Sequence, residues 1–139
     1  MKGEFLSHSA SETEALGAEL AKTLPKGAVV SLNGDLGAGK TAFVRGMAAA
    51  LGYEGRVTSP TFTIVNEYRK GRDTVLLHFD MYRLSSEEDL YGIGWYDYLD
   101  VGAVCAVEWA ERVEGALPSD AISVTIEGSG EAVRRITIE

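Results

Sequence analysis

The feature that most constrains this sequence is an eight-residue pattern at residues 34–41, GDLGAGKT, which matches G-x-x-x-x-G-K-[ST]. An apolar run at residues 28–32, typical of a strand buried in a sheet, comes just before it, and a predicted helix over residues 40–51 follows. A glycine-rich turn in this setting is typical of a phosphate-binding loop, because backbone N–H groups and the helix dipole converge on one concavity. In such a loop Lys40 reaches the β- and γ-phosphates of a nucleotide, and the Thr41 hydroxyl binds Mg²⁺.

Two acids are placed to complete a Mg²⁺ site, since this metal usually takes a carboxylate from the end of a neighbouring strand. Asp80 follows the apolar run at residues 75–79, and Glu108 follows the apolar run at residues 103–107. Spacing alone leaves open which of them binds the metal. His78 lies two residues before Asp80 and so on the same face of its strand, where it either orients that acid or an attacking water, or simply packs.

A hydroxyl-rich segment and several aromatic residues lie near these acids in the sequence. Residues 58–61, TSPT, follow the helix of the phosphate loop, where small NTPases carry γ-phosphate-sensing loops, although a plain turn into a strand has the same composition. The large aromatic side chains are expected to pack in the core or at an interface rather than on a cofactor. They are Trp95, Trp109, Tyr91, Tyr96 and Tyr98.

The region before the phosphate loop predicts a strand and a helix. A short strand at residues 4–6 leads to a helix from Ser9, in which leucines recur every four residues. Ser11 and Glu14 have the spacing of a capping box, and Pro25 follows the end of the helix.

The rest of the chain adds strands that do not fit a simple alternation of strand and helix. The predicted elements are a hairpin of residues 62–68 and 74–79, a short helix from Ser85 and Ser86 to about Tyr91, a strand at residues 103–107, and a closing hairpin of residues 122–126 and 133–138. No linker or repeat divides the chain. The sequence therefore predicts one α/β domain over residues 1–139, a P-loop NTPase domain with a mixed, mostly parallel central sheet, flanking helices and added antiparallel hairpins.

The chain is acidic, because 13 Lys and Arg stand against 21 Asp and Glu, which gives a formal charge of −8 at pH 7. Such a surface repels a polyanion, so direct and avid binding of nucleic acid is disfavoured. Residues 80–114 hold nine of the acids and two basic residues, which indicates either a solvated face or a metal site with a partner surface. No signal peptide or membrane span is predicted, and Cys105 is a single cysteine, so we expect a cytoplasmic protein that does not bind a membrane.

Four sequence blocks, in this order and at these spacings, resemble the bacterial TsaE (formerly YjeE) ATPases. They are residues 34–41, GDLGAGKT; residues 59–62, SPTF; residues 78–84, HFDMYRL; and residues 107–109, VEW. The resemblance covers about residues 9–118 and is more specific than the phosphate loop alone. It implies a slow Mg²⁺-dependent ATPase that binds ATP and ADP and is needed, with the proteins TsaD and TsaB, for threonylcarbamoyl modification of the adenosine next to the anticodon in tRNA.

The resemblance also implies roles for individual residues. Thr41 and Glu108 correspond to the metal ligands, Asp80 corresponds to the Walker B-like acid, and Lys40, Asp80 and Glu108 form the catalytic set. The implied nucleotide-binding residues are Ser9, Thr13, Gly34, Asp35, Leu36, Gly37, Ala38, Gly39, Lys40, Thr41 and Ala42, of which the first two lie near the adenine.

Other positions match the family less simply. The segment 59–62 corresponds to a switch-like loop, and Trp109 adjoins the metal acid. Ala42 and Ala110 depart from a Thr and a Pro that many members carry. Neither departure removes a phosphate or metal contact, so they bear on fine geometry rather than on activity.

Two other classes of P-loop protein are alternatives. A small-molecule kinase needs an acceptor pocket and an arginine-bearing lid, and only Lys70 and Arg72 in the predicted hairpin turn offer one. A GTPase carries an Asn-Lys-x-Asp motif that reads guanine, but Asn33 precedes Gly and Asn66 precedes Glu, so we set this class aside. With no arginine finger to spare, the chain alone is expected to hydrolyse ATP slowly and to act on tRNA only through its partners.

Overall fold

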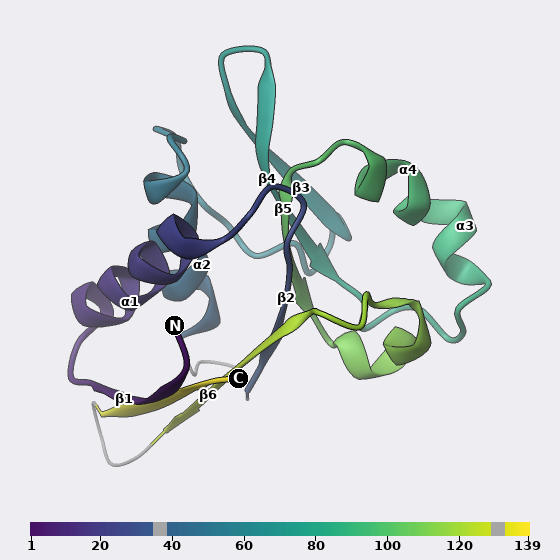
Figure 1. The fold of residues 1–139 in the computed structure, drawn as a ribbon. Helices are drawn as coiled ribbons and strands as arrows, with labels where there is room; N and C mark the ends of the chain where they lie inside the picture. Colours follow the sequence, from purple (N-terminus) through teal and green to yellow (C-terminus); the bar gives the residue numbers. More distant parts are fainter. Residues whose placement is uncertain (35–38, 129–132) are drawn as a thin grey trace.

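One mixed sheet forms the centre of the computed structural model, which describes residues 1–34, 39–128 and 133–139. In these residues the sheet has seven strands in the order β1-β7-β6-β2-β5-β4-β3 (Figure 1). The strands are β1 (Gly3–Ser7), β2 (Val29–Asn33), β3 (Val65–Lys70), β4 (Asp73–Asp80), β5 (Val104–Glu108), β6 (Ile122–Gly128) and β7 (Arg134–Ile138). The pairs β6·β2, β2·β5 and β5·β4 are parallel, whereas β1·β7, β7·β6 and β4·β3 are antiparallel. The predicted mixed sheet, parallel in its middle and extended by hairpins, is confirmed.

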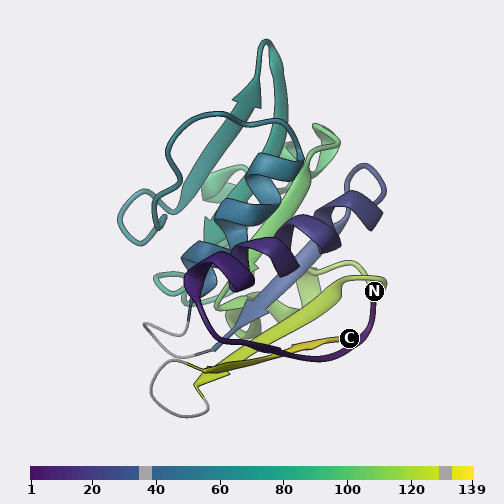
Figure 2. The same ribbon diagram turned by 90° about the vertical axis from the view of Figure 1, so that its left-hand side faces the viewer.

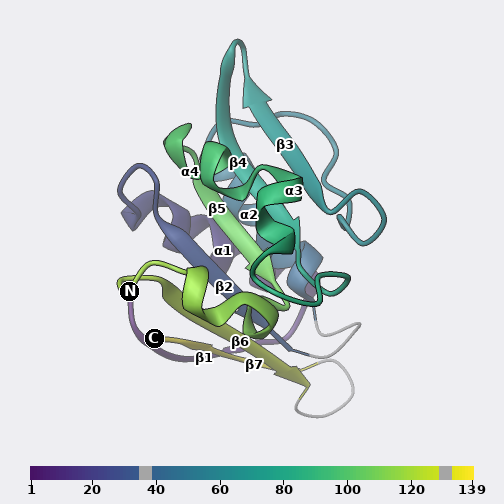
Figure 3. The same ribbon diagram turned by 90° about the vertical axis from the view of Figure 1, so that its right-hand side faces the viewer.

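Helices cover both faces of this sheet. The helices α1 (Ala10–Thr23) and α2 (Lys40–Ala50) lie side by side on one face (Figure 2), and their apolar residues form a buried cluster around Phe43. The helices α3 (Asp89–Ile93) and α4 (Trp95–Asp100) and the 3₁₀ helix η1 (Ala110–Ala116) lie on the other face (Figure 3), where the cluster surrounds Trp95. The interior strand β5 is buried along its whole length, as expected for a parallel strand covered on both faces.

Two glycines let α1 and α2 approach each other closely. A Cβ atom on Gly17 of α1 would collide with the carbonyl oxygen of Phe43, and one on Gly46 of α2 would collide with the carbonyl oxygen of Glu14. The close packing holds the start of α2 against α1, so that Gly39 lies beside Thr13: a Cβ atom at Gly39 would be 3.8 Å from the Thr13 Cγ2 atom.

The cap of α1 differs from its prediction. The capping box at Ser11 and Glu14 is wrong, because the helix begins two residues earlier. Ser9 is the N-cap, and its Oγ accepts a hydrogen bond of 3.1 Å from the Glu12 N–H. The Glu12 carboxylate accepts a hydrogen bond from the His8 N–H. The cap therefore has the predicted Ser-x-x-Glu spacing, but at Ser9 and Glu12, two residues closer to the end of β1.

Other element boundaries also differ from their predictions. The short helix α3 begins at Asp89 rather than after Ser86, because the Asp89 carboxylate accepts hydrogen bonds from the N–H and Oγ of Ser85 and closes a turn first. The strand β3 begins at Val65 rather than at residue 62, since Ile64 has a φ of 70° and cannot continue a strand. The helices α4 and η1 were not predicted.

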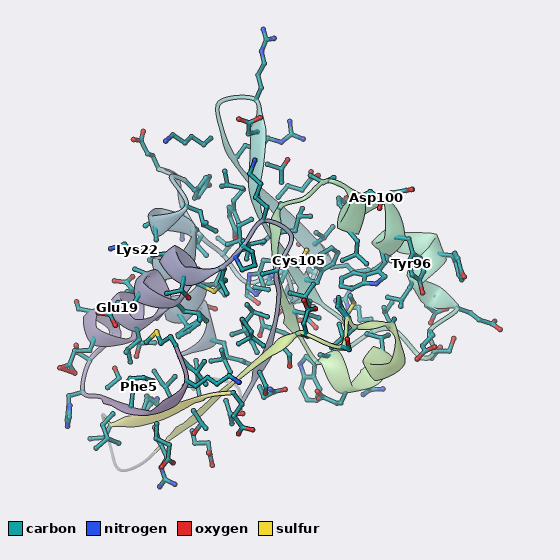
Figure 4. All side chains as sticks on the ribbon, viewed as in Figure 1. Phe5, Glu19, Lys22, Tyr96, Asp100 and Cys105 are labelled. Carbon is teal, nitrogen blue, oxygen red and sulfur yellow. The ribbon has the colours of Figure 1, made fainter. Side chains whose placement is uncertain are left out.

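Charged side chains lie mostly on the outside. Figure 4 shows Glu19 and Lys22 on the outer side of α1, and Tyr96 and Asp100 on α4. Among the acids of the segment 80–114 whose side chains the structure describes, only Asp80 and Glu108 are buried, and the exposed ones are Glu87, Glu88, Asp97, Asp100 and Glu111. In the described part of the chain, no helix combines the length and apolar character needed to cross a bilayer.

Candidate functional site

A cavity of about 540 Å³ opens at the edge of the sheet where β4 and β5 end and α2 begins. Its lining residues come from four separate segments; they are Gly39, Lys40, Thr41, Ser59, Thr61, Asp80, Tyr82, Glu108 and Trp109. Ligands of open α/β sheets bind outside the carboxyl ends of the strands, which is where this cavity lies. The sequence-predicted Lys40, Thr41, Asp80 and Glu108 are thus brought together.

The start of α2 presents its backbone and a lysine to this cavity. Gly39 is the N-cap residue and has the left-handed conformation, with φ 103° and ψ 15°. Because it is a glycine, no side chain of the N-cap residue bonds to the first N–H groups of the helix. Lys40 Nζ donates to the Gly34 carbonyl oxygen at 2.9 Å and lies 3.3 Å from Glu108 Oε1. The uncapped N–H groups of a helix start and a nearby ammonium together favour an anion.

Glu108 is the most tightly held acid of the site. It ends β5, is 6% exposed, and its second carboxylate oxygen, Oε2, lies 2.6 Å from His78 Nε2. Burial raises the pKa of the Glu108 carboxyl, but the hydrogen bond to His78 and the charge of Lys40 outweigh burial and bring the pKa below its ordinary value. Glu108 is therefore an ionised carboxylate in a buried position.

Asp80 ends β4 directly opposite Glu108 in the parallel register. It is 7% exposed, and its Oδ1 accepts a hydrogen bond of 2.9 Å from the N–H of Tyr82. Its own N–H donates to the carbonyl oxygen of Ile64 at 2.8 Å. Neither acid is a solvated surface residue or a helix cap.

His78 contacts a different acid from the one that sequence spacing suggested. The sequence left His78 either to orient Asp80, two residues along the same strand, or an attacking water, or simply to pack. In the structure it reaches across to Glu108 on β5, and the Asp80 carboxylate is oriented by a backbone N–H instead. The reason is the strand register: His78 stands opposite Ala106, whose small side chain leaves room toward Glu108.

The hydroxyl-rich segment after α2 forms part of the cavity wall. Ser59 and Thr61 line the cavity, and their hydroxyls lie 2.7 Å apart. The loop is closed by a hydrogen bond of 2.8 Å from the Ile64 N–H to the Pro60 carbonyl oxygen. The Ile64 carbonyl oxygen also accepts a hydrogen bond from the Asp80 N–H, so this loop is joined to the backbone of one of the two acids.

Aromatic side chains form another part of the wall. Trp109 is 39% exposed, has a φ of 59°, and its ring centroid lies 4.8 Å from that of Tyr82. The guanidinium carbon of Arg112 lies 5.0 Å from the Tyr82 centroid, and Lys40 Nζ lies 5.9 Å from the Trp109 centroid. Trp95 is buried as predicted. Tyr82 was missed by sequence reasoning, although its position two residues after Asp80 was a usable signal.

The other predicted nucleotide-binding residues fall into two groups, those that the structure does not describe and those that it places. Asp35, Leu36, Gly37 and Ala38 lie outside the described residues. Ser9 and Thr13 are absent from the lining; the Thr13 hydroxyl is buried and lies 2.7 Å from the Ser7 hydroxyl. Gly34 contributes its carbonyl oxygen to Lys40, and Ala42 lies on α2 next to Thr41. The adenine contacts of Ser9 and Thr13 remain a prediction.

The donor set of the cavity suits a magnesium ion that is shared with a ligand. In the described residues, no group of three or more His, Cys, Asp or Glu is arranged to hold a metal. Mg²⁺ commonly takes only one or two protein ligands and completes its shell with phosphate and water. The Thr41 hydroxyl and the carboxylates of Glu108 and Asp80 are among the oxygen donors that line this cavity.

Comparison with known proteins finds relatives over nearly the whole chain. The family model described as "Threonylcarbamoyl adenosine biosynthesis protein TsaE" matches residues 7–136. A Treponema pallidum (strain Nichols) protein named tRNA threonylcarbamoyladenosine biosynthesis protein TsaE is 41% identical over 133 residues, or 96% of this chain and 97% of that protein. The protein of that name from Bacillus subtilis (strain 168) is 41% identical over 126 residues, or 91% of this chain and 78% of that protein.

A solved structure shares the fold as well as the sequence. The crystal structure of YdiB from Bacillus subtilis superposes with a TM-score of 0.79 at 34% sequence identity, and the match covers 99% of this chain and 84% of YdiB. The likeness therefore extends well beyond residues 34–41 to the whole arrangement of strands and helices.

Proposed function

Because the chain belongs to the TsaE family, we propose that it is a Mg²⁺-dependent P-loop ATPase that acts in threonylcarbamoyladenosine modification of tRNA in the cytoplasm. The observation that carries the ATPase part is the cluster at the start of α2, where Lys40 Nζ lies between the Gly34 carbonyl and the buried Glu108 carboxylate. A lysine at a helix start, beside an acid and an open cavity, is the donor set that a Mg²⁺–nucleotide requires. The names of the relatives support the tRNA part.

The cavity fits the phosphates of ATP or ADP in size and in chemistry. Its volume of about 540 Å³ is within the roughly 300–1,000 Å³ of small-molecule sites. The first N–H groups of α2 receive phosphate oxygens, and Lys40 exchanges its contact with Glu108 for the β- and γ-phosphates. The exchange leaves Glu108 as an ionised carboxylate without its ammonium partner, which favours a cation in its place.

Thr41 and Glu108 are the residues that would hold Mg²⁺, and Asp80 is the second acid of the site. When bound, Mg²⁺ neutralises the charge of the phosphates. Asp80, oriented by the N–H of Tyr82, would accept a hydrogen bond from the attacking water and hold it in line. The hydroxyls of Ser59 and Thr61 face the same cavity and would sense the γ-phosphate.

The chain alone is proposed to be a slow ATPase. Among the described residues that line the cavity, Lys40 is the only cation. Arg83 lies over the ring of Phe62 and Arg112 over that of Tyr82, so neither extends into the site. Partner proteins TsaD and TsaB would complete the active arrangement and hold the tRNA, since a chain with a charge of −8 binds RNA poorly by itself.

The alternative of a small-molecule kinase is not supported, because the two candidate lid residues lie far from the cavity. Lys70 and Arg72 lie at the turn between β3 and β4, at the opposite end of β4 from Asp80. Seven residue steps along a strand span roughly 23 Å. These cations are too far from the cavity to cover a transferred phosphoryl group.

Nucleotide binding and turnover test the proposal. ADP binding by calorimetry and steady-state ATP hydrolysis would be measured for the wild-type chain, Lys40→Ala and the control Arg45→Ala. Arg45 pairs with Glu14 on the exposed side of α2, 2.8 Å away. Lys40→Ala is expected to weaken ADP binding by at least about 10-fold, the loss of one charge-assisted hydrogen bond, whereas Arg45→Ala binds as the wild type.

Reconstitution tests the dependence on partners. Addition of TsaD and TsaB should accelerate hydrolysis, and tRNA modification should require all three proteins and ATP. A wild-type chain that binds no nucleotide, or one that turns over tens of ATP molecules per second alone, would overturn the proposal.

A further inference from the structure

A buried hydrogen bond links His78 of β4 to Glu108 of β5. The side chain of His78 is 0% exposed, and its Nε2 lies 2.6 Å from Glu108 Oε2. Because His78 stands opposite Ala106 in the register, it reaches the carboxylate two residues further along β5. Such a short contact between two side chains that are almost wholly removed from water is the tightest polar contact around the cavity.

The donor of this hydrogen bond follows from the groups around Glu108. Oε1 faces the ammonium of Lys40, which can only donate, and Oε2 faces His78 Nε2, so the geometry assigns the donor role in the second contact to His78 Nε2. His78 Nδ1 is buried and has no hydrogen-bond partner in the described residues. In the part of the chain that the structure describes, the contact of Nε2 with Glu108 is therefore the one hydrogen bond of this ring.

The two carboxylate oxygens of Glu108 therefore make different contacts. Oε2 is occupied by His78, while Oε1 lies 3.3 Å from Lys40 Nζ at the cavity. Asp80 is also held at one oxygen, Oδ1, but by the backbone N–H of Tyr82 rather than by a buried side chain. A carboxylate held at one oxygen cannot turn about its last bond, and its other oxygen points in one direction only.

We infer that His78 is a positioning residue: its Nε2–H holds Oε2 of Glu108, so that Oε1 alone is presented to the cavity, to Lys40 in the free protein and to a divalent cation when the nucleotide takes Lys40. This inference rests on the proposed function, because it concerns the same site. Residues that orient a metal-binding side chain in this way typically change metal affinity by about 10–100-fold when they are replaced.

Space-filling alone is the competing explanation for His78, and the chain offers variants that separate the two. His78→Leu keeps a buried side chain without a donor. His78→Gln keeps a donor at the reach of Nε2, whereas in His78→Asn the amide is too short to reach Glu108. Leu76→Val is the packing control, because Leu76 is fully buried two residues earlier on the same face of β4 and lies away from Glu108.

The test measures ADP binding by calorimetry in excess EDTA and in excess Mg²⁺, together with the melting temperature of each variant. The readout is the dissociation constant in EDTA divided by the dissociation constant in Mg²⁺. This ratio measures how much the metal strengthens ADP binding and does not depend on the stability of the fold. We expect His78→Leu and His78→Asn to lower this ratio by about 10-fold relative to the wild type, with metal-free binding within about twofold of it. His78→Gln should recover most of the ratio, and Leu76→Val should lower only the melting temperature.

Two outcomes would overturn the inference: His78→Leu with the wild-type ratio, or His78→Gln and His78→Asn with the same ratio as each other. The Gln–Asn comparison decides the question even where His78→Leu does not fold. A wild-type chain without ADP binding contradicts the proposed function itself, whereas a wild type that binds Mg²⁺–ADP beside unaffected variants contradicts only the role of His78.

Discussion

Asp80 and Glu108 stand directly opposite each other at the ends of two parallel strands, and each is more than nine-tenths buried. Two buried carboxylates side by side repel each other unless each has its own donors. Glu108 has Lys40 and His78, whereas Asp80 has the N–H of Tyr82. The two acids, which are equivalent by sequence position, are therefore different in chemical environment.

Exchange of each acid for its amide tests this difference. Glu108→Gln is expected to remove the effect of Mg²⁺ on ADP binding while metal-free binding persists, because the phosphate-binding N–H groups remain. Asp80→Asn should keep the effect of Mg²⁺ and lower hydrolysis by about 10²–10⁴-fold, the contribution of a positioned acid or base. Calorimetry with and without Mg²⁺, and ATP hydrolysis with partners, would check both. If Asp80→Asn abolishes the Mg²⁺ effect and Glu108→Gln does not, the two assignments are exchanged.

The crossing of α1 and α2 makes a second prediction, on stability. Gly→Ala in a helix usually stabilises by about 0.5–1 kcal/mol. Gly17→Ala should instead destabilise the fold by about 1–3 kcal/mol, because its Cβ meets the Phe43 carbonyl oxygen. Gly92→Ala in α3 is the control, since nothing lies within 4 Å of its Cβ position. Urea unfolding of both variants provides the comparison, and equal effects would show that the helices separate easily.

Backbone strain at Ile64 makes a third prediction. A β-branched residue at a φ of 70° is costly, since the left-handed region disfavours a side chain by about 1–2 kcal/mol. Ile64→Gly should therefore be more stable than Ile64→Ala by about 1 kcal/mol. At Val65, the first residue of β3, the order should be reversed, because glycine weakens a regular strand. Chemical denaturation of the four variants would measure both differences, and the same order at both positions would contradict strain at Ile64.

The buried thiol of Cys105 makes a fourth prediction, on pH. Burial raises the pKa of Cys105 from 9.0 to about 12, so the folded thiol stays protonated where the unfolded thiol ionises. The folded state then binds more protons, and the free energy of unfolding should fall as pH rises from about 9 toward 12, by up to about 1.4 kcal/mol per unit. Cys105→Ala should remove this slope.

Alkylation provides a second readout for Cys105. The folded chain is expected to resist iodoacetamide at pH 8, and the urea-unfolded chain should react at once, because only the thiolate is nucleophilic. Rapid labelling of the folded chain at pH 8 would show that the thiol is neither buried nor protonated.

The buried strands and the helix that follows residues 34–41 were predictable because their signals are local. A glycine-rich turn between an apolar run and a helix is readable within about 20 residues, and so is an acid that ends a strand. The errors were also local in origin: at the cap of α1, Ser9–Glu12 and Ser11–Glu14 have the same spacing, and only the end of β1 selects the first. Helices α4 and η1 are too short to show a periodic pattern.

By itself the sequence determined which residues meet at the carboxyl edge of the sheet, since parallel strands bring their ends to the same edge whatever their order. Only the tertiary structure decided that His78 binds Glu108 rather than Asp80, that Tyr82 joins the wall of the cavity, and that Thr13 lies against Gly39. Periodicity states the face on which a side chain lies, but its neighbour on that face depends on strand register and on the crossing of helices. These are set by packing among residues that are far apart in the chain.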